Sequence, residues 1–245
     1  MLGLGNTLSG GIVPAAAAAG LTNEYSIAFD GSNDHITTAD AKQSVDNATT
    51  SFWMKSSKTS GYQNVFGKGH TTWYIGTFNN KMYVKWAGTG SSGLSGGTDV
   101  CDSAWHHHVI VFAGGYGVAS EIRVYMDGVL KDTLGANDGQ GYTLGVGVWS
   151  IGHYGGSNVF IGNLDEVAIW EGIELDADAI AAIYNSGTPT DLKTDDGNYD
   201  NSGDLSHWWR MGDGDTFATI QDNQGSNDGT MVNMASGDIV ADIPS

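Results

Sequence analysis

The chain has 245 residues and is strongly acidic, with 10 Lys and Arg against 28 Asp and Glu and a net charge of −18. Nucleic acids and anionic membranes are bound through clustered basic residues, so this balance argues against both as partners. The single cysteine, Cys101, excludes an internal disulfide, and no basic residue before Lys42 supplies the charged start of a signal peptide.

Residues 1–21 are small, uncharged and rich in Gly and Ala, and Pro14 interrupts any helix among them. Such a segment cannot build a core, so we expect an extended N-terminal arm that is either disordered or packed on a partner. Residues 22–245 are then predicted to form one domain.

From Tyr25 the chain is a succession of short apolar or alternating runs separated by Gly, Ser, Asn and Asp. Runs of this length at this spacing are typical of a β-sandwich. The predicted fold class is therefore all-β, an antiparallel β-sandwich. The expected strands include residues 26–29, 35–38, 51–55, 64–67, 72–77, 81–86, 147–152, 160–162, 206–211 and 229–234.

The middle of the chain, Trp105 to Thr133, predicts the centre of a sheet. Asp127-Gly128 between apolar runs is a strong hairpin signal, because both residues tolerate the positive φ of a type I′ turn. The three histidines 106–108 at the start of this stretch are either zinc ligands or structural histidines, and the second interpretation is favoured because no third zinc ligand is fixed by the sequence.

Two elements follow. Leu164 to Trp170 is predicted to be a strand. Simple alternation would place both apolar and acidic side chains on each of its faces, so its two ends must differ in environment. One short helix is predicted near residues 176–186, with Asp176 as N-cap and Gly187 placed after its C-terminus.

Five motifs in this order resemble a laminin-G-like domain of the concanavalin A-like lectin/glucanase jelly-roll family. They are Ser26–Ile36, Ser51–Lys55, Trp105–Val109, Ile122–Gly128 and Gly162–Trp170. The resemblance implies a jelly roll over residues 22–190. Sequence similar to segments that come first in many of these domains occurs here last, at His207–Asp215 and Asp222–Met231. Residues 205–245 are therefore expected to complete the same sandwich in permuted order; a truncated second repeat is the alternative.

The whole arrangement also resembles virion-associated proteins of marine tailed bacteriophages. This resemblance implies a non-enzymatic virion structural protein, a capsid decoration or tail appendage subunit. It would sit on the particle exterior in many copies or as a homo-oligomer, contacting other virion proteins through residues 1–21. Host-surface glycans are the further partner implied. A secreted or cell-surface carbohydrate-binding module is the alternative.

A glycoside hydrolase is a distant third interpretation, because hydrolases of this shape carry acidic residues at alternating strand positions. Here Asp165 and Glu166 are adjacent, and Glu171 and Glu174 follow at other spacings. We therefore predict no catalytic residues.

Calcium is the predicted ion, since it prefers oxygen ligands from loops. The resemblance would bring Asp30, Asn33, Asp34 and Asp165 together. A second group has the spacing of a calcium loop but lacks its glycine and its final glutamate; it consists of Asp196, Asn198, Asp200 and Asp204.

Aromatic residues in the expected loops form the candidate glycan-binding set, because aromatic faces stack on sugar rings. Burial in the core is the competing interpretation for each of them. The set comprises Trp73, Tyr74, Trp86, Tyr116, Tyr142, Trp149 and Tyr154.

Overall fold

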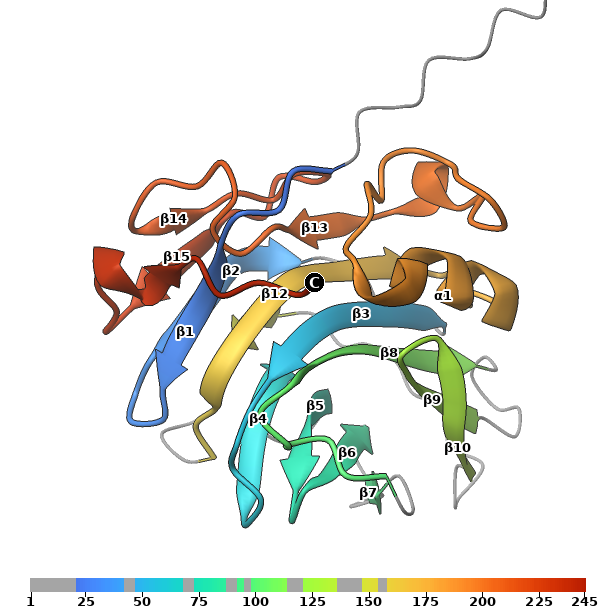
Figure 1. The fold of residues 1–245 in the computed structure, drawn as a ribbon, viewed down its shortest axis with the longest axis horizontal. Helices are drawn as coiled ribbons and strands as arrows, with labels where there is room; N and C mark the ends of the chain where they lie inside the picture. Colours follow the sequence, from blue (N-terminus) through green and yellow to red (C-terminus); the bar gives the residue numbers. More distant parts are fainter. Residues whose placement is uncertain are drawn as a thin grey trace, which may run out of the picture.

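A computed structural model describes residues 21–41, 47–67, 73–86, 92–94, 98–113, 121–135, 147–153 and 158–245. The predicted arm therefore lies outside the described residues, apart from Leu21. Within the described part the chain is a sandwich of two antiparallel sheets with one short α-helix, which confirms the predicted fold class (Figure 1). No helix in these ranges has the length and apolarity needed to cross a membrane.

Sheet A carries the central hairpin and the long strand near residue 165. Its order is β10 (Val129–Gly135), β9 (Glu121–Met126), β8 (Trp105–Ala113), β3 (Ala48–Lys55), β12 (Ile161–Glu171), β1 (Ser26–Asp30) and β16 (Ile239–Val240), and β13 (His207–Trp209) also pairs with β12. The β9–β10 turn has positive φ at Asp127 and Gly128, as the sequence predicts.

Sheet B packs against the inner face of sheet A. Its order is β14 (Thr219–Ile220), β15 (Gly229–Val232), β2 (His35–Ala41), β11 (Gly147–Ile151), β4 (Tyr62–Gly67), β5 (Trp73–Phe78), β6 (Lys81–Trp86) and β7 (Ser92–Leu94).

Two hydrophobic cores hold these layers. The first lies between the sheets and includes Phe52 and Ile110 of sheet A and Ile75 and Met82 of sheet B. The second lies on the outer face of sheet A, under α1 (Ala177–Tyr184) (Figure 1). Sheet A is therefore covered on both faces, which accounts for the long buried runs of β3, β8 and β12.

Helix α1 begins at the predicted residue and ends differently from the prediction. The Asp176 carboxylate accepts a hydrogen bond from the Ala179 amide at 2.8 Å, which is the expected N-cap. At the other end Asn185, with φ of 46°, takes the left-handed conformation before Gly187 is reached. Asparagine tolerates this conformation, so it replaces the predicted glycine as the helix terminator.

The mixed alternation of β12 has a specific cause. Its register with β3 shifts between Asp165 and Ala168, and Glu166 has a φ of 49°. This is a β-bulge, in which an extra residue reverses the alternation. Leu164 and Val167 consequently both face the core between the sheets, although they are three positions apart.

The last forty residues contribute to both sheets. β13 pairs with β12 and β16 with β1 in sheet A, while β15 pairs with β2 in sheet B. Neighbouring Trp208 and Trp209 point to opposite faces of β13, Trp208 into the core under α1 and Trp209 into the core between the sheets. Each tryptophan thus has a packing partner that a separate hairpin would lack.

Candidate functional site

The first predicted calcium group is not assembled. Asp30 and Asp34 lie in the β1–β2 turn, where the Asp34 carboxylate accepts from the Asp30 amide at 3.0 Å. Because Asp30 pairs with Ile161, Asp165 lies four positions further along β12, about 13 Å away. The expected grouping fails because Asp30, the last residue of β1, pairs with the first residue of β12, whereas Asp165 lies past the first residues of β1.

The second calcium group lies in an exposed loop. Asp196 pairs with Tyr199 through backbone hydrogen bonds, and the Asp204 carboxylate accepts from Asn201 at 3.1 Å. In the described part of the chain, no three His, Cys, Asp or Glu side chains are arranged to hold a metal ion. Calcium binding by Asp196, Asn198, Asp200 and Asp204 stays a prediction.

The predicted glycan-binding aromatics fall into three groups. Trp73, Tyr74 and Trp86 lie in β5 and β6. Trp149 is fully buried and stacks on Phe66 at 4.6 Å, so it belongs to the core and is not accessible to a ligand. The others, Tyr116, Tyr142 and Tyr154, lie outside the described residues.

The three successive histidines have separate structural roles. His106 is hydrogen-bonded to Asp127 at 2.8 Å, and this contact raises the pKa of His106. His107 and His108 point to opposite faces of sheet A, and burial lowers the pKa of each to about 3. Both are therefore neutral at pH 7, and alternation along β8 separates them rather than gathering them around an ion.

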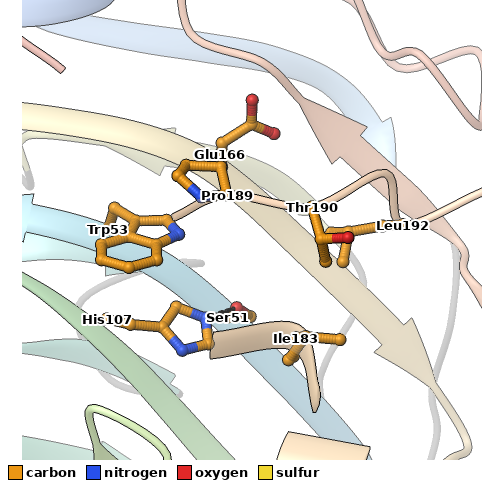
Figure 2. Close-up of a pocket in the computed structure, with 8 residues that line it drawn as sticks. All are labelled: Ser51, Trp53, His107, Glu166, Ile183, Pro189, Thr190 and Leu192. Atoms are coloured by element: carbon orange, nitrogen blue, oxygen red, sulfur yellow. Dashed lines mark hydrogen bonds between the residues drawn. The ribbon is translucent and has the colours of Figure 1, made fainter. Parts of the chain in front are cut away.

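A small pocket with a cavity volume of about 10 Å³, enough for about one water molecule, opens between sheet A and the segment after α1. Its lining includes Ser51, Trp53, His107, Pro189 and the stem of Glu166 (Figure 2). Ser51 Oγ and His107 Nε2 are hydrogen-bonded at 2.7 Å, but the other ring nitrogen of His107 has no hydrogen-bond partner among the described residues. A Ser–His pair without a third group that orients the histidine does not form a hydrolytic triad.

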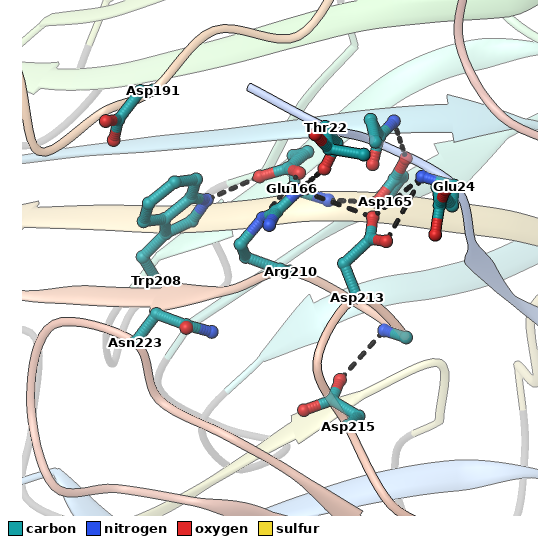
Figure 3. Close-up of polar contacts among 12 residues, drawn as sticks. Thr22, Glu24, Asp165, Glu166, Asp191, Trp208, Arg210, Asp213, Asp215 and Asn223 are labelled. Atoms are coloured by element: carbon teal, nitrogen blue, oxygen red, sulfur yellow. Dashed lines mark hydrogen bonds and ion pairs between the residues drawn. The ribbon is translucent and has the colours of Figure 1, made fainter. Parts of the chain in front are cut away.

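A buried polar cluster fills the bulge of β12, and we call it the polar junction. It consists of Asp165, Glu166, Arg210 and Asp213 (Figure 3). β1 pairs with the first part of β12 and β13 with the second, so these two strands lie end to end along one edge. The polar junction occupies the gap between them.

The charged side chains of the polar junction are hydrogen-bonded to β13 and to the first described residues of the chain. Glu166 accepts from Arg210 Nε at 3.2 Å and from the Trp208 indole at 2.6 Å. Arg210 also donates to the Thr22 carbonyl at 2.6 Å, and the Asp213 carboxylate accepts from the Glu24 amide at 3.1 Å. The first described residues of the chain are thereby attached to its C-terminal segment.

This cluster holds three carboxylates and one guanidinium, and burial changes the pKa of Glu166 and of Asp165. Burial raises the pKa of Glu166 to about 7, although Arg210 and Trp208 oppose the shift. Burial and the neighbouring charge of Glu166 raise the pKa of Asp165 well above its usual range. Figure 2 shows the Glu166 carboxylate directed away from the pocket lining, so it does not face a bound substrate there.

An aromatic group that the sequence analysis does not single out stands on sheet B. Tyr62, Phe78 and Tyr83 form what we call the aromatic surface. The rings of Tyr62 and Phe78 stack at 4.1 Å, and Tyr83 meets Tyr62 edge-on at 5.3 Å. Tyr62 is 37% exposed, whereas the neighbouring positions Ile75, Met82 and Val84 point into the core.

The turn between β5 and β6 positions this surface. Asn79 and Asn80 both have positive φ, as a tight hairpin turn requires. The Asn79 side chain accepts from the Gly61 amide at 3.0 Å, and the Asn80 side chain accepts from the Cys101 amide at 2.7 Å. The turn therefore fixes the residue before Tyr62 and the segment that follows β7.

A sequence signal for this surface exists in β6. Lys81, Tyr83 and Lys85 alternate with Met82 and Val84, which is the pattern of a half-buried strand with a polar and aromatic outer face. The convergence of Tyr62 and Phe78 on Tyr83 depends on strand register, which this pattern alone does not give.

Comparison with known proteins gives a family match over most of this region. The model of the concanavalin A-like lectin/glucanases superfamily matches residues 30–181. Among curated proteins, none matches the sequence.

Several solved structures share the fold. A candidate carbohydrate-binding protein from Bacteroides ovatus has a TM-score of 0.67 and 16% identity over 91% of this chain; the chain spans 62% of that protein. A heptameric SAP-like pentraxin from Limulus polyphemus has a TM-score of 0.55 and 16% identity, covering 66% of this chain and 82% of its own. Domain 4 of an extracellular arabinanase from Geobacillus stearothermophilus, in complex with arabinotriose, has a TM-score of 0.51 and 18% identity, with 65% and 76% covered.

Proposed function

Because the chain belongs to the concanavalin A-like lectin/glucanases superfamily, we propose that it is a non-enzymatic, lectin-like domain that binds glycans. The aromatic surface carries this proposal. Tyr62 and Phe78 are stacked, Tyr83 packs edge-on against Tyr62, and a fixed turn holds them, so little side-chain freedom is lost when a ligand binds. Aromatic faces pack on sugar rings. The hydroxyl group of a tyrosine such as Tyr62 or Tyr83 can also form a hydrogen bond with a sugar hydroxyl.

The polar junction supports the non-enzymatic part of the proposal. A glycosidase places two carboxyl groups on either side of the scissile bond, about 5 to 5.5 Å apart for retention or about 6.5 to 9.5 Å for inversion. Asp165 and Glu166 are adjacent, buried and engaged with Asn23, Trp208 and Arg210. This arrangement stabilises the join between the two ends of the chain and leaves neither carboxylate free to act on a sugar.

A glycan array tests the binding function. Wild-type protein should bind at least one class of glycan, and Tyr62→Ala should lower that signal by about tenfold, because an anchor ring is lost. Tyr25→Ala is the matched control, since Tyr25 is also a tyrosine of similar exposure, 40%, and lies outside the aromatic surface. Equal loss in both variants, or no binding by the wild type, would count against the proposal.

We further propose that this domain is carried on the exterior of a tailed-phage virion, as a capsid decoration or tail appendage subunit. Residues 1–21 would contact other virion proteins. Two features support this: the likeness of the whole chain to phage virion proteins, and the attachment of Thr22 and Glu24 to the polar junction, which gives the arm a fixed origin on the domain. The acidic charge suits an exterior surface that must stay soluble.

Deletion of residues 2–20 distinguishes this role from a secreted or cell-surface carbohydrate-binding module. The truncated domain should unfold at the same temperature as the full chain and should be missing from purified particles. Normal incorporation of the truncated chain would exclude the arm as the anchor. Absence of the full chain from particles, combined with glycan binding, would favour the carbohydrate-binding module.

A further inference from the structure

The charges of this protein are segregated along the chain. Residues 47–98 contain five lysines and no Asp or Glu, although the whole chain carries 28 acidic residues. This segment supplies β3 through β7, including the three strands that bear the aromatic surface. The strands of sheet B that carry the aromatic surface therefore contribute lysines and no carboxylates, although Asp99 of a later segment contacts Lys81.

Two of these lysines lie beside the aromatic surface. Lys58 Nζ donates to the Tyr62 carbonyl at 3.1 Å, which places its ammonium group next to that ring's backbone. Lys81 stands opposite Phe78 across the turn and on the same face of β6 as Tyr83, two residues away.

Carboxylates near this region are already paired. Asp99 contacts Lys81 at 2.5 Å and remains largely exposed, and Asp102 contacts His106 at 3.2 Å. The Lys81–Asp99 pair is a surface ion pair, which contributes little stability and exchanges readily with a better anion. Among the described residues the Lys58 ammonium donates to a carbonyl, and no carboxylate competes for it.

We propose that the aromatic surface binds an anionic saccharide, with a sugar ring on Tyr62 and Phe78 and its carboxylate or sulfate group held by Lys58 and Lys81. This inference rests on the proposed glycan-binding function and adds the class of sugar. A charged acceptor strengthens a hydrogen bond from an ammonium group, so an acidic sugar gains from both lysines what a neutral sugar does not.

The net charge of −18 does not oppose this assignment at short range. Charges are screened beyond about 8 Å at physiological ionic strength, so a ligand on sheet B interacts mainly with the groups around it. Single-stranded nucleic acid also combines anions with rings, but it requires a basic groove that follows several phosphates. Two lysines beside a compact aromatic group fit one sugar unit better than a polynucleotide.

The test uses matched pairs of polymers: polygalacturonate with its methyl ester, and dextran sulfate with dextran. Each pair keeps the backbone and removes the charge. Binding is measured by biolayer interferometry for the wild type and for the double variant with Lys58→Gln and Lys81→Gln. Lys131→Gln on β10 is the control, because it removes one positive charge from an exposed lysine on sheet A. A single-stranded oligonucleotide is the third probe.

We expect the wild type to bind at least one charged polymer about tenfold more tightly than its neutral partner, and the double variant to lose that preference while Lys131→Gln keeps it. Binding of polygalacturonate identifies a carboxylate as the preferred anion, and binding of dextran sulfate identifies a sulfate. Equal binding of charged and neutral partners would overturn the inference and leave glycan binding intact. Binding of none of the four polymers would overturn the inference, and the glycan array then decides the proposed function separately. Preferred binding of the oligonucleotide would also overturn it.

Discussion

Arg210 Nε donates to the Glu166 carboxylate at 3.2 Å, and this contact joins the end of β13 to the bulge of β12 beside the start of β1. Both side chains are buried or nearly so, with 15% and 4% exposed. The gap between β1 and β13, which lie along the same side of β12 and are far apart in the sequence, is thus bridged by this buried ion pair.

Removal of one partner of this pair should be costly. Arg210→Gln leaves Glu166 buried without its cation, and we expect a loss of about 3 to 5 kcal/mol in the free energy of unfolding. The double variant with Glu166→Gln should recover part of that loss, because no buried charge then remains. Urea denaturation of the wild type, the two single variants and the double variant gives the coupling energy between the two residues. If the two single losses of stability simply add in the double variant, a direct interaction is contradicted.

The pH dependence of stability follows from Glu166. Its pKa is raised from 4.5 to about 7 in the folded state, so the folded protein binds more protons than the unfolded chain between these values. The stabilisation is complete below pH 4.5 and is lost as the pH rises through 7. The melting temperature should therefore be higher at pH 5.5 than at pH 8. Glu166→Gln should flatten this part of the curve, and an unchanged slope would assign it to another group.

A second titration acts in the opposite direction. Although burial opposes it, hydrogen bonds from His207 and from the amides of Gly225, Trp208 and Asn227 hold the pKa of Asp222 at about 2. Its contribution is present above pH 3.8 and is lost as the pH falls through 2. Asp222→Asn should cost about 2 kcal/mol at pH 7, because several charge-assisted hydrogen bonds weaken. Acid unfolding should become less steep in this variant; an unchanged acid midpoint and slope would contradict the assignment.

Asn79 connects turn geometry to ligand binding. Asn79→Gly preserves the positive φ and removes the hydrogen bond to the Gly61 amide. We expect stability to change by about 1 kcal/mol or less and glycan affinity to fall severalfold, since Tyr62 loses its fixed position. Thermal melting and glycan binding, measured together, separate the two effects. Unchanged affinity would show that the turn does not position the aromatic surface.

Much of the fold follows from local patterns in the sequence. The Asp127-Gly128 turn and the Asp176 cap depend on neighbouring residues, and the structure confirms both. The bulge at Glu166 appears in the sequence only as a failure of alternation in β12. Its location could not be read from that pattern, because it depends on where β1 begins and β13 ends along the same side of β12.

The candidate site was less predictable for a related reason. Trp149 occupies a strand like its exposed neighbour Val148, and only the packing of the two sheets shows that it faces Phe66. Asp165 was expected near Asp30, and the register of β1 separates them. Tyr62 and Phe78 are sixteen residues apart and become neighbours through the β4–β5 pairing. Exposure and proximity are properties of the assembled sheets.

A titration of isotope-labelled protein with trigalacturonate, followed through its backbone amide NMR signals, tests whether the aromatic surface is the glycan site. If the aromatic surface is the glycan site, the signals of Gly61, Tyr62, Asn79 and Lys81 should shift together with increasing ligand, and those of α1 should stay in place. Shifts confined to the pocket at Trp53 and His107, with none at Tyr62, would contradict the account.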